Sequence, residues 1–284
     1  MIGQRINLDH LTTTPLHPEV REALEPYLDE ECGSPAALHQ GGLRARDALA
    51  RARGQVARLI GAESPDSVVF TSGATEAANL AIKGAAWASR RRGNHVILTG
   101  IEHPAIDRSV AFLEGQGIEA TRVPVDRRGM IDPDSIRSVL RSETFLVCVH
   151  HAQHDLGTIQ PLAEIASVMA DRSAVLFVDA SASGGWVPLN VQQLRIDLLS
   201  LAPHRFYGPK GVGILYRHRR ARLASLIHGG SQEGGLRAGT ENVPAIVGAG
   251  VAAVVSQREL ESRSVQVGRV QKILLDQLSA AVPL

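Results

Sequence analysis

The sequence predicts an α/β protein with a mostly parallel sheet and helices on both faces. Short runs of β-branched and other apolar residues alternate along the chain with amphipathic stretches of helical length, which is typical of βαβ units. Several of these runs are apolar throughout, as expected for strands that are covered on both sides in a parallel sheet. The length of 284 residues allows one large domain or two modest ones.

The expected elements follow in chain order. Residues 18–31 and 42–60 are expected to be helical and precede the sheet. Strands are expected at residues 67–71, 95–100, 119–123, 144–150, 174–179, 198–202 and 212–216. Between them, helices are expected at residues 74–90, from Pro104 onward, at 133–140 and at 161–171. After Thr240 a long helical region is expected to run nearly to the end, with a break around residues 256–259.

Composition and charge exclude several classes of protein. Lys and Arg total 30 and Asp and Glu total 29, so the formal charge of +1 gives no global case for binding nucleic acid or an anionic membrane. Cys32 and Cys148 form neither a disulfide framework nor a zinc-binding spacing. The first residues lack the apolar core of a signal peptide, and the apolar stretch 243–255 is too short to span a bilayer. We therefore expect a cytoplasmic protein.

Polar residues follow several of the expected strands, at the edge where open α/β sheets bind ligands. Residues 71–76 form a small turn before a helix, where backbone N–H groups and the helix dipole favour an anion. His103 could stack on a flat ligand or act as a base, and Asp179 could pair with a protonated ring nitrogen. Residues 202–211 place His204 and Arg205 together. Each of these polar residues can also be explained without a ligand, as a helix cap or as a residue of a surface loop.

The order and spacing of these loops resemble the cysteine desulfurases, pyridoxal-phosphate (PLP) enzymes of the class V aminotransferase group. The resemblance extends from about Asn7 to Gly250. The matching motifs are TSGATE at 71–76, IEHPAI at 101–106, HAQHDLG at 151–157, VDASASGG at 178–185, FYGPKG at 206–211 and RAGT at 237–240. The resemblance implies the large domain of the fold type I PLP enzymes over residues 1–250. Residues 251–284 would then be a helical remnant of a small domain that is largely missing.

The resemblance also implies a role for each matching residue. Ala74 and Thr75 would hold the cofactor phosphate at a helix N-terminus, with His204 beside it. His103 would stack on the pyridine ring, and Asp179 would keep the pyridine nitrogen protonated, which makes the ring an electron sink.

The resemblance implies a homodimer with shared sites, in which Thr240 reaches the phosphate bound by the neighbouring subunit. The chain could also pair with an intact paralogue or with a sulfur-acceptor or scaffold protein.

The family pattern fails at Arg205, where the family has the lysine that forms the Schiff base. A guanidinium stays protonated and is a poor nucleophile, so it can neither form this bond nor shuttle the substrate proton. The chain has three lysines, of which Lys210 is close in sequence, but the family has a lysine at that turn as well. We expect Arg205 to pair with Asp179 and fill the cofactor slot. The alternative is that it turns toward the anion turn at Thr75.

Other positions depart from the family as well. Ala182 replaces a glutamine that bonds the phenolic oxygen of the cofactor, and Ala202 replaces a phosphate-binding serine. Gln153 and His154 replace a pair of asparagines, and Ser34 replaces the asparagine that begins another segment. Several hydrogen-bond donors to one ligand are therefore lost together.

The sequence also ends before the family's mobile loop with its persulfide cysteine and before its substrate-binding arginine. Neither Cys32 nor Cys148 matches that cysteine by position. Cys148 is expected to be an inert packing residue inside a strand.

Three functional hypotheses follow. The preferred one is a degenerate cysteine desulfurase homologue that acts as a structural or regulatory partner in sulfur or iron–sulfur metabolism. The alternative is an enzyme of altered chemistry that uses PLP or pyridoxamine phosphate on cysteine or a related amino acid, with His103 and the Arg205 position as its catalytic candidates. A third is a sulfur-acceptor or scaffold-binding module without a cofactor, which rests on analogy alone.

Overall fold

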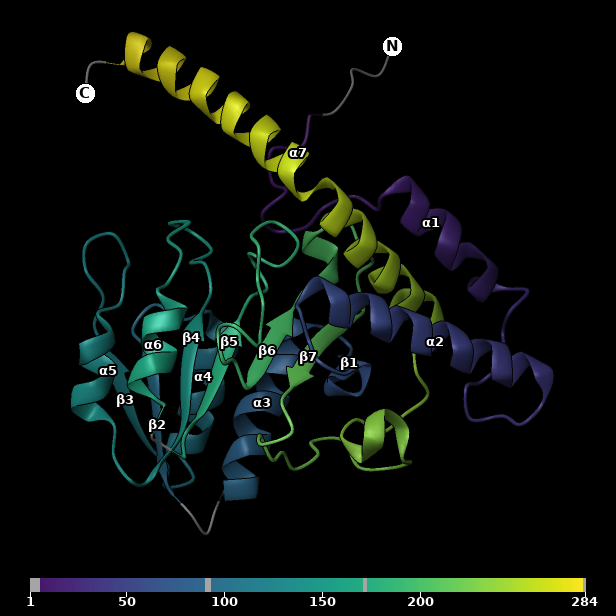
Figure 1. The fold of residues 1–284 in the computed structure, drawn as a ribbon, viewed down its shortest axis with the longest axis horizontal. Helices are drawn as coiled ribbons and strands as arrows, with labels where there is room; N and C mark the ends of the chain where they lie inside the picture. Colours follow the sequence, from purple (N-terminus) through teal and green to yellow (C-terminus); the bar gives the residue numbers. More distant parts are fainter. Residues whose placement is uncertain (1–5, 90–92, 171–172, 283–284) are drawn as a thin grey trace.

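The computed structural model describes residues 6–89, 93–170 and 173–282. They form a sheet with the strand order β1-β7-β6-β5-β4-β2-β3 (Figure 1). The strands are β1 (Val68–Thr71), β2 (His95–Thr99), β3 (Glu119–Val123), β4 (Thr144–His150), β5 (Val175–Asp179), β6 (Leu198–Leu201) and β7 (Gly213–Arg217). Neighbouring strands from β3 to β6 are parallel, whereas β7 is antiparallel to both β1 and β6. The expected mostly parallel α/β sheet is confirmed.

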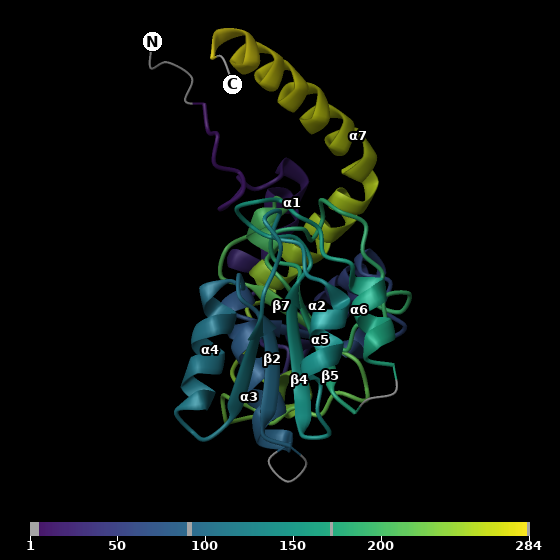
Figure 2. The same cartoon turned by 90° about the vertical axis from the view of Figure 1, so that its left-hand side faces the viewer.

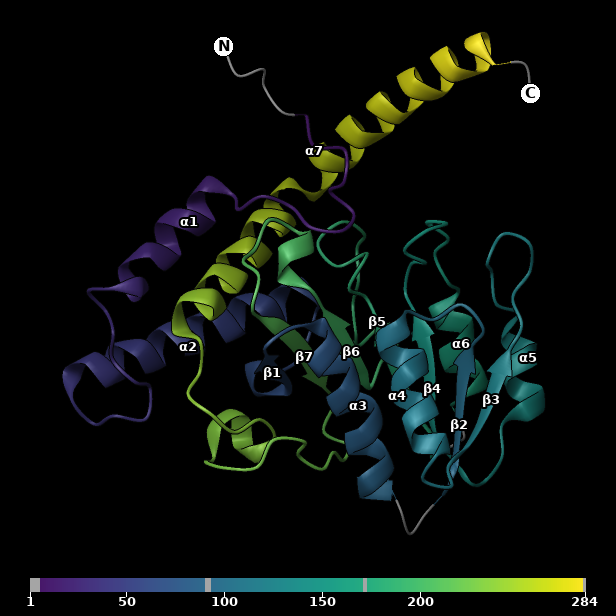
Figure 3. The same ribbon diagram turned by 180° about the vertical axis from the view of Figure 1, so that it is seen from behind.

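Helices cover both faces of the sheet, as the apolar strands predict. One face packs against α3 (Ala74–Ser89) and α4 (Pro104–Glu114), which lie in front of the strands in Figure 3. The other face packs against the remaining helices, which are α1 (Pro18–Leu24), α2 (Gln40–Leu59), α5 (Pro133–Val139), α6 (Leu162–Val168) and α7 (Val243–Ala281).

Strand β4 shows how the two cores are built. Val147 and Val149 belong to the core on the face covered by α1, α2, α5, α6 and α7, while Leu146 and Cys148 belong to the core under α3 and α4. This alternation follows from the two-residue period of a strand. Cys148 is buried, as expected of a packing residue, and burial raises the pKa of its thiol well above the ordinary value. The strand therefore contributes polar chemistry only where it ends.

Helix α7 is continuous, so the expected break at residues 256–259 is wrong. Arg258 pairs with Glu19 of α1 at 2.6 Å, and Arg263 pairs with Glu259 at 2.9 Å. Arg263 also lies over the Tyr207 ring at 4.5 Å, so the middle of the helix is anchored where we expected it to end. Figure 2 shows the second half of α7 extending away from the sheet.

The structure bears on two further expectations about the helices. The division at residue 250 falls inside α7, and the separation into two domains stays a prediction. The expected helix ends at residues 90 and 171 lie outside the described residues. Within the described part of the chain, α7 is the one helix long and apolar enough to cross a membrane by length and composition, and 56% of its most apolar window is buried in the fold.

A buried ion pair anchors the segment that leads from the sheet to α7. Glu233, whose side chain is 2% exposed, accepts bonds from the Arg53 guanidinium at 2.7 Å and from the Phe70 backbone N–H at 2.8 Å. Arg53 comes from α2, so this carboxylate joins a helix, a strand and the loop that precedes α7.

We expect Arg53→Met to lower the free energy of unfolding by about 3–5 kcal/mol, because it leaves the Glu233 carboxylate buried without its counter-charge. Chemical denaturation monitored by circular dichroism measures this change. The matched control is Arg137→Met, since Arg137 pairs with Asp134 at 3.1 Å on an exposed helix surface and should cost under about 1 kcal/mol. Equal losses in the two variants would contradict the structural role of the buried pair.

Candidate functional site

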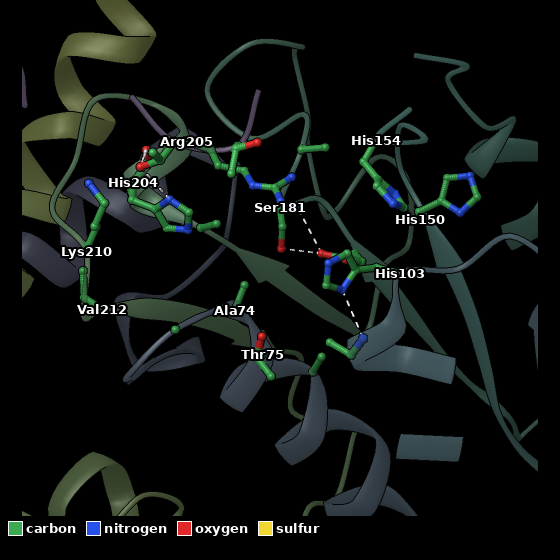
Figure 4. A pocket seen from close by; sticks show the side chains of 18 of the residues that line it. Ala74, Thr75, His103, His150, His154, Ser181, His204, Arg205, Lys210 and Val212 are labelled. Carbon is green, nitrogen blue, oxygen red and sulfur yellow. Dashed lines mark hydrogen bonds between the residues drawn. The ribbon is translucent and has the colours of Figure 1, made fainter. Parts of the chain in front are cut away.

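A cavity of about 490 Å³ lies at the carboxyl edge of the sheet (Figure 4). This volume is in the range of small-molecule sites. Its wall contains the loops after β1, β2, β4, β5 and β6, together with the N-terminal segment around Thr13. The expected site residues Ala74, Thr75, His103, Asp179, His204 and Arg205 all line it, as do Ala182, Ala202 and His154. The structure therefore brings together the residues that the sequence pattern selected.

Thr240 is the exception. It is exposed and does not line this cavity. Its expected role in a neighbouring site stays a prediction.

The register of the sheet places three polar side chains next to one another, of which His150 and Asp179 line the cavity and Ser200 is buried beneath it. His150 of β4 pairs with Asp179 of β5, and Asp179 pairs with Ser200 of β6. Asp179 Oδ1 accepts a bond from the Ser200 hydroxyl at 2.8 Å, from the Ser181 hydroxyl at 2.5 Å and from the Ser181 N–H at 3.0 Å. One carboxylate oxygen is thus saturated by serines.

The expected ion pair between Arg205 and Asp179 is absent from the ion pairs of the described residues, so that expectation is wrong. The physical reason is that two serines already solvate the carboxylate, which removes the need for a cationic partner. No hydrogen bond within the described part of the chain joins Arg205 to Thr75 either. In Figure 4 the Arg205 side chain lies between His204 and Ser181, beside the cavity.

The backbone that carries Arg205 is held on both sides. The short 3-10 turn Pro203–Arg205 receives the Thr14 N–H at its His204 carbonyl (2.8 Å) and the Trp186 indole N–H at its Arg205 carbonyl (2.7 Å). Tyr207, which follows at φ +66°, donates its N–H to the Thr14 hydroxyl at 2.7 Å. Hydrogen bonds from Thr14 and Trp186 to the backbone therefore fix the position of residue 205, and its own side chain takes no part in them.

The anion turn forms as expected between β1 and α3. Ser72 donates its N–H to the Glu76 carboxylate at 2.8 Å, and Glu76 pairs with Arg237 at 3.0 Å. The first turn of a helix leaves backbone N–H groups without intrahelical partners, and here Ala74 and Thr75 line the cavity. Gly213 of β7 backs this turn, because a side-chain Cβ there would lie 2.1 Å from the Gly73 carbonyl carbon.

His103 begins α4 and presents its ring to the cavity. Its Nδ1 accepts the Ala105 N–H at 3.1 Å, so the neutral ring carries its proton on Nε2. Burial lowers the pKa of His103, against the charge of Asp179, which raises it. The His154 ring stands edge-on to His103, with the two centroids 5.3 Å apart. The two imidazoles form one wall of the cavity.

Gln153 and His154 have separated roles, which sequence reasoning did not predict. The buried Gln153 side chain accepts the N–H groups of Asp155 (2.5 Å) and Leu156 (2.6 Å), so it holds its own turn. His154 lines the cavity and lies 3.5 Å from the Asp155 carboxylate. Only the second of the two positions faces a ligand.

His204 lies at the phosphate side of the cavity that the resemblance implies. Its Nδ1 is 3.2 Å from the Thr13 hydroxyl. Burial lowers the pKa of His204, and the positive charges of Arg205 and Lys210 lower it further. A neutral imidazole is thus favoured here.

Sequence reasoning missed His150, which lines the cavity but has no nitrogen free for a ligand. Gln160 accepts the Ile131 N–H at its Oε1 (3.0 Å), so its amide NH₂ group faces His150 Nε2 at 2.9 Å. His150 Nε2 must then accept, and His150 Nδ1 carries the proton that it donates to Glu102 at 2.9 Å. His150 positions the floor and is no candidate base. Its place at the end of a buried strand, like that of Asp179, was the available signal.

The three lysines have different surroundings, and all three are described. Lys210 lines the cavity, whereas Lys83 lies over the Phe112 ring at 4.4 Å and Lys272 pairs with Asp276 at 3.3 Å. Lys210 follows His204 and Arg205 on the same loop. Of the two cysteines, Cys32 is exposed and does not line the cavity.

The neighbouring His151 gives a prediction on pH. It is buried, its Nδ1 is 2.9 Å from the Ser183 hydroxyl, and burial lowers its pKa from 6.5 to about 4. Between these two values the unfolded chain binds the proton and the folded chain does not, so stability falls as the pH falls. From pH 7 to pH 5, His151 should cost roughly 2 kcal/mol of unfolding free energy.

His151→Gln should remove that part of the pH dependence in urea denaturation curves. The control, His228→Gln, changes an exposed histidine and should leave the dependence unaltered. An identical acid destabilisation in His151→Gln and in the unmodified protein would refute the assignment.

Comparison with known proteins agrees with the geometry. Residues 6–282 match the aminotransferase class-V family. The cysteine desulfurase IscS of Dictyoglomus turgidum is 44% identical over 258 residues, which are 91% of this chain and 65% of that protein. The cysteine desulfurase IscS 1 of Archaeoglobus fulgidus is 41% identical over 268 residues, which are 94% of this chain and 70% of that protein.

The fold is also found among solved structures. The structure of a NifS-like protein superposes with a TM-score of 0.95 at 34% identity, covering 98% of this chain and 76% of the other. The chain spans 65% of the length of the Dictyoglomus turgidum relative. This family is generally PLP-dependent. The chain belongs to the aminotransferase class-V family and, within it, to the IscS and NifS group of cysteine desulfurase homologues.

Proposed function

We propose that this chain is a degenerate cysteine desulfurase homologue that binds PLP without a covalent link and does not release sulfur from cysteine. It acts in the cytoplasm as a structural or regulatory partner in sulfur or iron–sulfur metabolism. The observation that carries the proposal is Arg205, which stands beside the cavity at the position of the family lysine. Its guanidinium cannot form the imine bond that attaches the cofactor.

The residues present fit the ring and phosphate of PLP. Asp179 offers a carboxylate at the end of a buried strand, with one oxygen held by serines. His103 offers a ring face, and the start of α3 offers backbone N–H groups. Because Arg205 forms no ion pair with Asp179 among the described residues, the space next to the Asp179 carboxylate is open to a ligand. The covalent attachment of PLP does not fit the same residues.

Each residue of the cavity would have a definite task toward the cofactor. Ser181 and Ser200 orient Asp179, so that its carboxylate would keep a pyridine nitrogen protonated. Ala74 and Thr75 would bind the phosphate, with neutral His204 beside it. When bound, PLP supplies a ring that withdraws electrons.

The surrounding groups also explain why turnover is not expected. His150 uses both ring nitrogens within the protein, and His103 uses one to cap α4. Arg205 keeps its proton. Ala182 and Ala202 provide no side-chain donor to the cavity. The cavity therefore lacks the movable proton carrier that family chemistry needs at position 205.

The alternative function, an enzyme of altered chemistry on an amino acid, is favoured by one observation. His103 and His154 both line the cavity, and His103 could move a proton at its Nε2, whereas His154 Nε2 lies 3.5 Å from the Asp155 carboxylate. Product analysis after incubation with PLP or pyridoxamine phosphate and cysteine separates this reading from the degenerate one.

The proposal predicts that the purified chain, given PLP and cysteine, releases no sulfide above the rate without protein. A family member that has the lysine is the positive control. Arg205→Lys restores an amine, yet it should show at most weak absorbance from PLP attached covalently to that lysine, beyond the absorbance of PLP bound without a covalent link, because Ala182 and Ala202 provide no side-chain donor to the ring or the phosphate. Strong absorbance from covalently attached PLP, together with sulfide release, would show that the site is intact apart from the lysine. That result would overturn the proposal of a degenerate homologue.

We further propose a homodimer, in which Thr240 of each subunit reaches the partner's phosphate site. Its support is the exposed position of Thr240 together with the retained RAGT segment. Symmetric dimers are the commonest soluble oligomers. Sedimentation velocity at tens of micromolar, a concentration chosen to be roughly ten times a typical micromolar dissociation constant, should give a dimer. A monomer at that concentration would reject the proposal.

A further inference from the structure

The charges around the cavity are unbalanced. Among the described residues that line it, Asp179 is the only acidic side chain. The same wall contains Arg205, Lys210 and the positive N-terminal end of α3. The cavity is therefore suited to a ligand with more than one negative charge.

Among the described residues, neither Arg205 nor Lys210 has a side-chain hydrogen bond or ion pair, and Arg205 is the one of the two that carries a guanidinium. A guanidinium has five N–H donors in a planar fork, a geometry that matches a carboxylate. Within the described part of the chain, hydrogen bonds involve only the backbone of Arg205, through its N–H to Ala202 and its carbonyl to Trp186. Because the backbone is held by these bonds and by Thr14, the side chain is presented from a rigid base.

The two ends of the cavity are already assigned to other groups. In the proposed function, the turn before α3 would bind the phosphate, and Asp179 would pair with the protonated ring nitrogen. Arg205 lies between His204 and Ser181 (Figure 4). Because the resemblance puts the Schiff-base lysine at this position, a bound ring would turn its carbon-4 substituent toward residue 205. The side chain of residue 205 therefore decides which substituent the cavity accepts at that carbon.

We infer that the cavity selects vitamin B6 phosphates whose carbon-4 substituent bears a carboxylate, and that Arg205 determines this selectivity. A phosphopyridoxyl amino acid, in which the ring methylene is joined to the amino group of an amino acid, is such a ligand. Pyridoxamine phosphate has the cationic amine of such a conjugate but no carboxylate to offset it, so the guanidinium disfavours it. The inference rests on the proposed non-covalent binding and names the ligand class for it.

The test measures affinity with compounds that have no aldehyde, so no covalent bond to any lysine can form. The full chain is titrated by calorimetry with N-phosphopyridoxyl-glycine, with pyridoxine phosphate and with pyridoxamine phosphate. The glycine conjugate and pyridoxamine phosphate both carry a cationic amine on the ring methylene, so they differ in the carboxylate. A charge-assisted hydrogen bond from Arg205 to that carboxylate predicts that the conjugate binds about tenfold or more tightly than pyridoxamine phosphate. Pyridoxamine phosphate should bind most weakly of the three.

Arg205→Met should reduce the ratio of the affinities for the glycine conjugate and for pyridoxamine phosphate to about one. Arg205→Lys should keep part of this preference, because a lysine retains the positive charge but not the planar pair of N–H donors. Lys83→Met removes a cation outside the cavity and should leave the ratio as in the unmodified protein. Thermal melts of each variant, followed by circular dichroism, show whether it is folded.

Equal affinities in the unmodified protein, a preference that persists in Arg205→Met, or no binding of any of the three compounds would each overturn the inference. Failure of the proposed function is seen separately, as sulfide release from cysteine or as PLP that borohydride fixes to a lysine. Either of those results leaves the measured affinity ratio to be judged by itself.

Discussion

The site depends on the register among β4, β5 and β6. Because all three strands run in the same direction and are buried on both faces, polar side chains are tolerated only where the strands end. The register then places His150, Asp179 and Ser200 in one row. A shift of one residue would turn Asp179 into an apolar core and remove the cavity floor. The same strand register therefore determines both the packing of the core and the position of the site residues.

The way Asp179 is solvated decides the electrostatics of the cavity. Hydrogen bonds from Ser181 and Ser200 stabilise the carboxylate without neutralising it, so its charge remains available to a ligand. Had the carboxylate paired with Arg205, both charges would have cancelled and the cavity would have been filled. With serines as its partners, Asp179 keeps its negative charge in the cavity while Arg205 and Lys210 supply positive charge. This arrangement favours a ligand that has a positive group facing Asp179 and negative groups facing the two cations.

The sequence predicted the strands because each is a short apolar run followed by polar or glycine residues, and it predicted the site because strand ends converge at one edge. It could not predict the bonds within that edge. The Arg205–Asp179 pair was expected from charge alone, whereas the outcome depends on Ser200, which is adjacent only through the register. The continuous α7 was missed for a similar reason, since Arg263 packs on Tyr207, distant in sequence.

The frame around residue 205 does not need the family lysine. Thr14 and Trp186 bond the backbone of the turn, and Gln160 and Glu102 satisfy His150, so these contacts persist whatever side chain stands at position 205. Among the described residues, the hydrogen bonds around position 205 therefore use its backbone and not its side chain. A cavity whose walls are held in this way is already shaped before a ligand arrives, and binding does not have to order them. A preformed site of this kind suits the non-covalent binding that we propose.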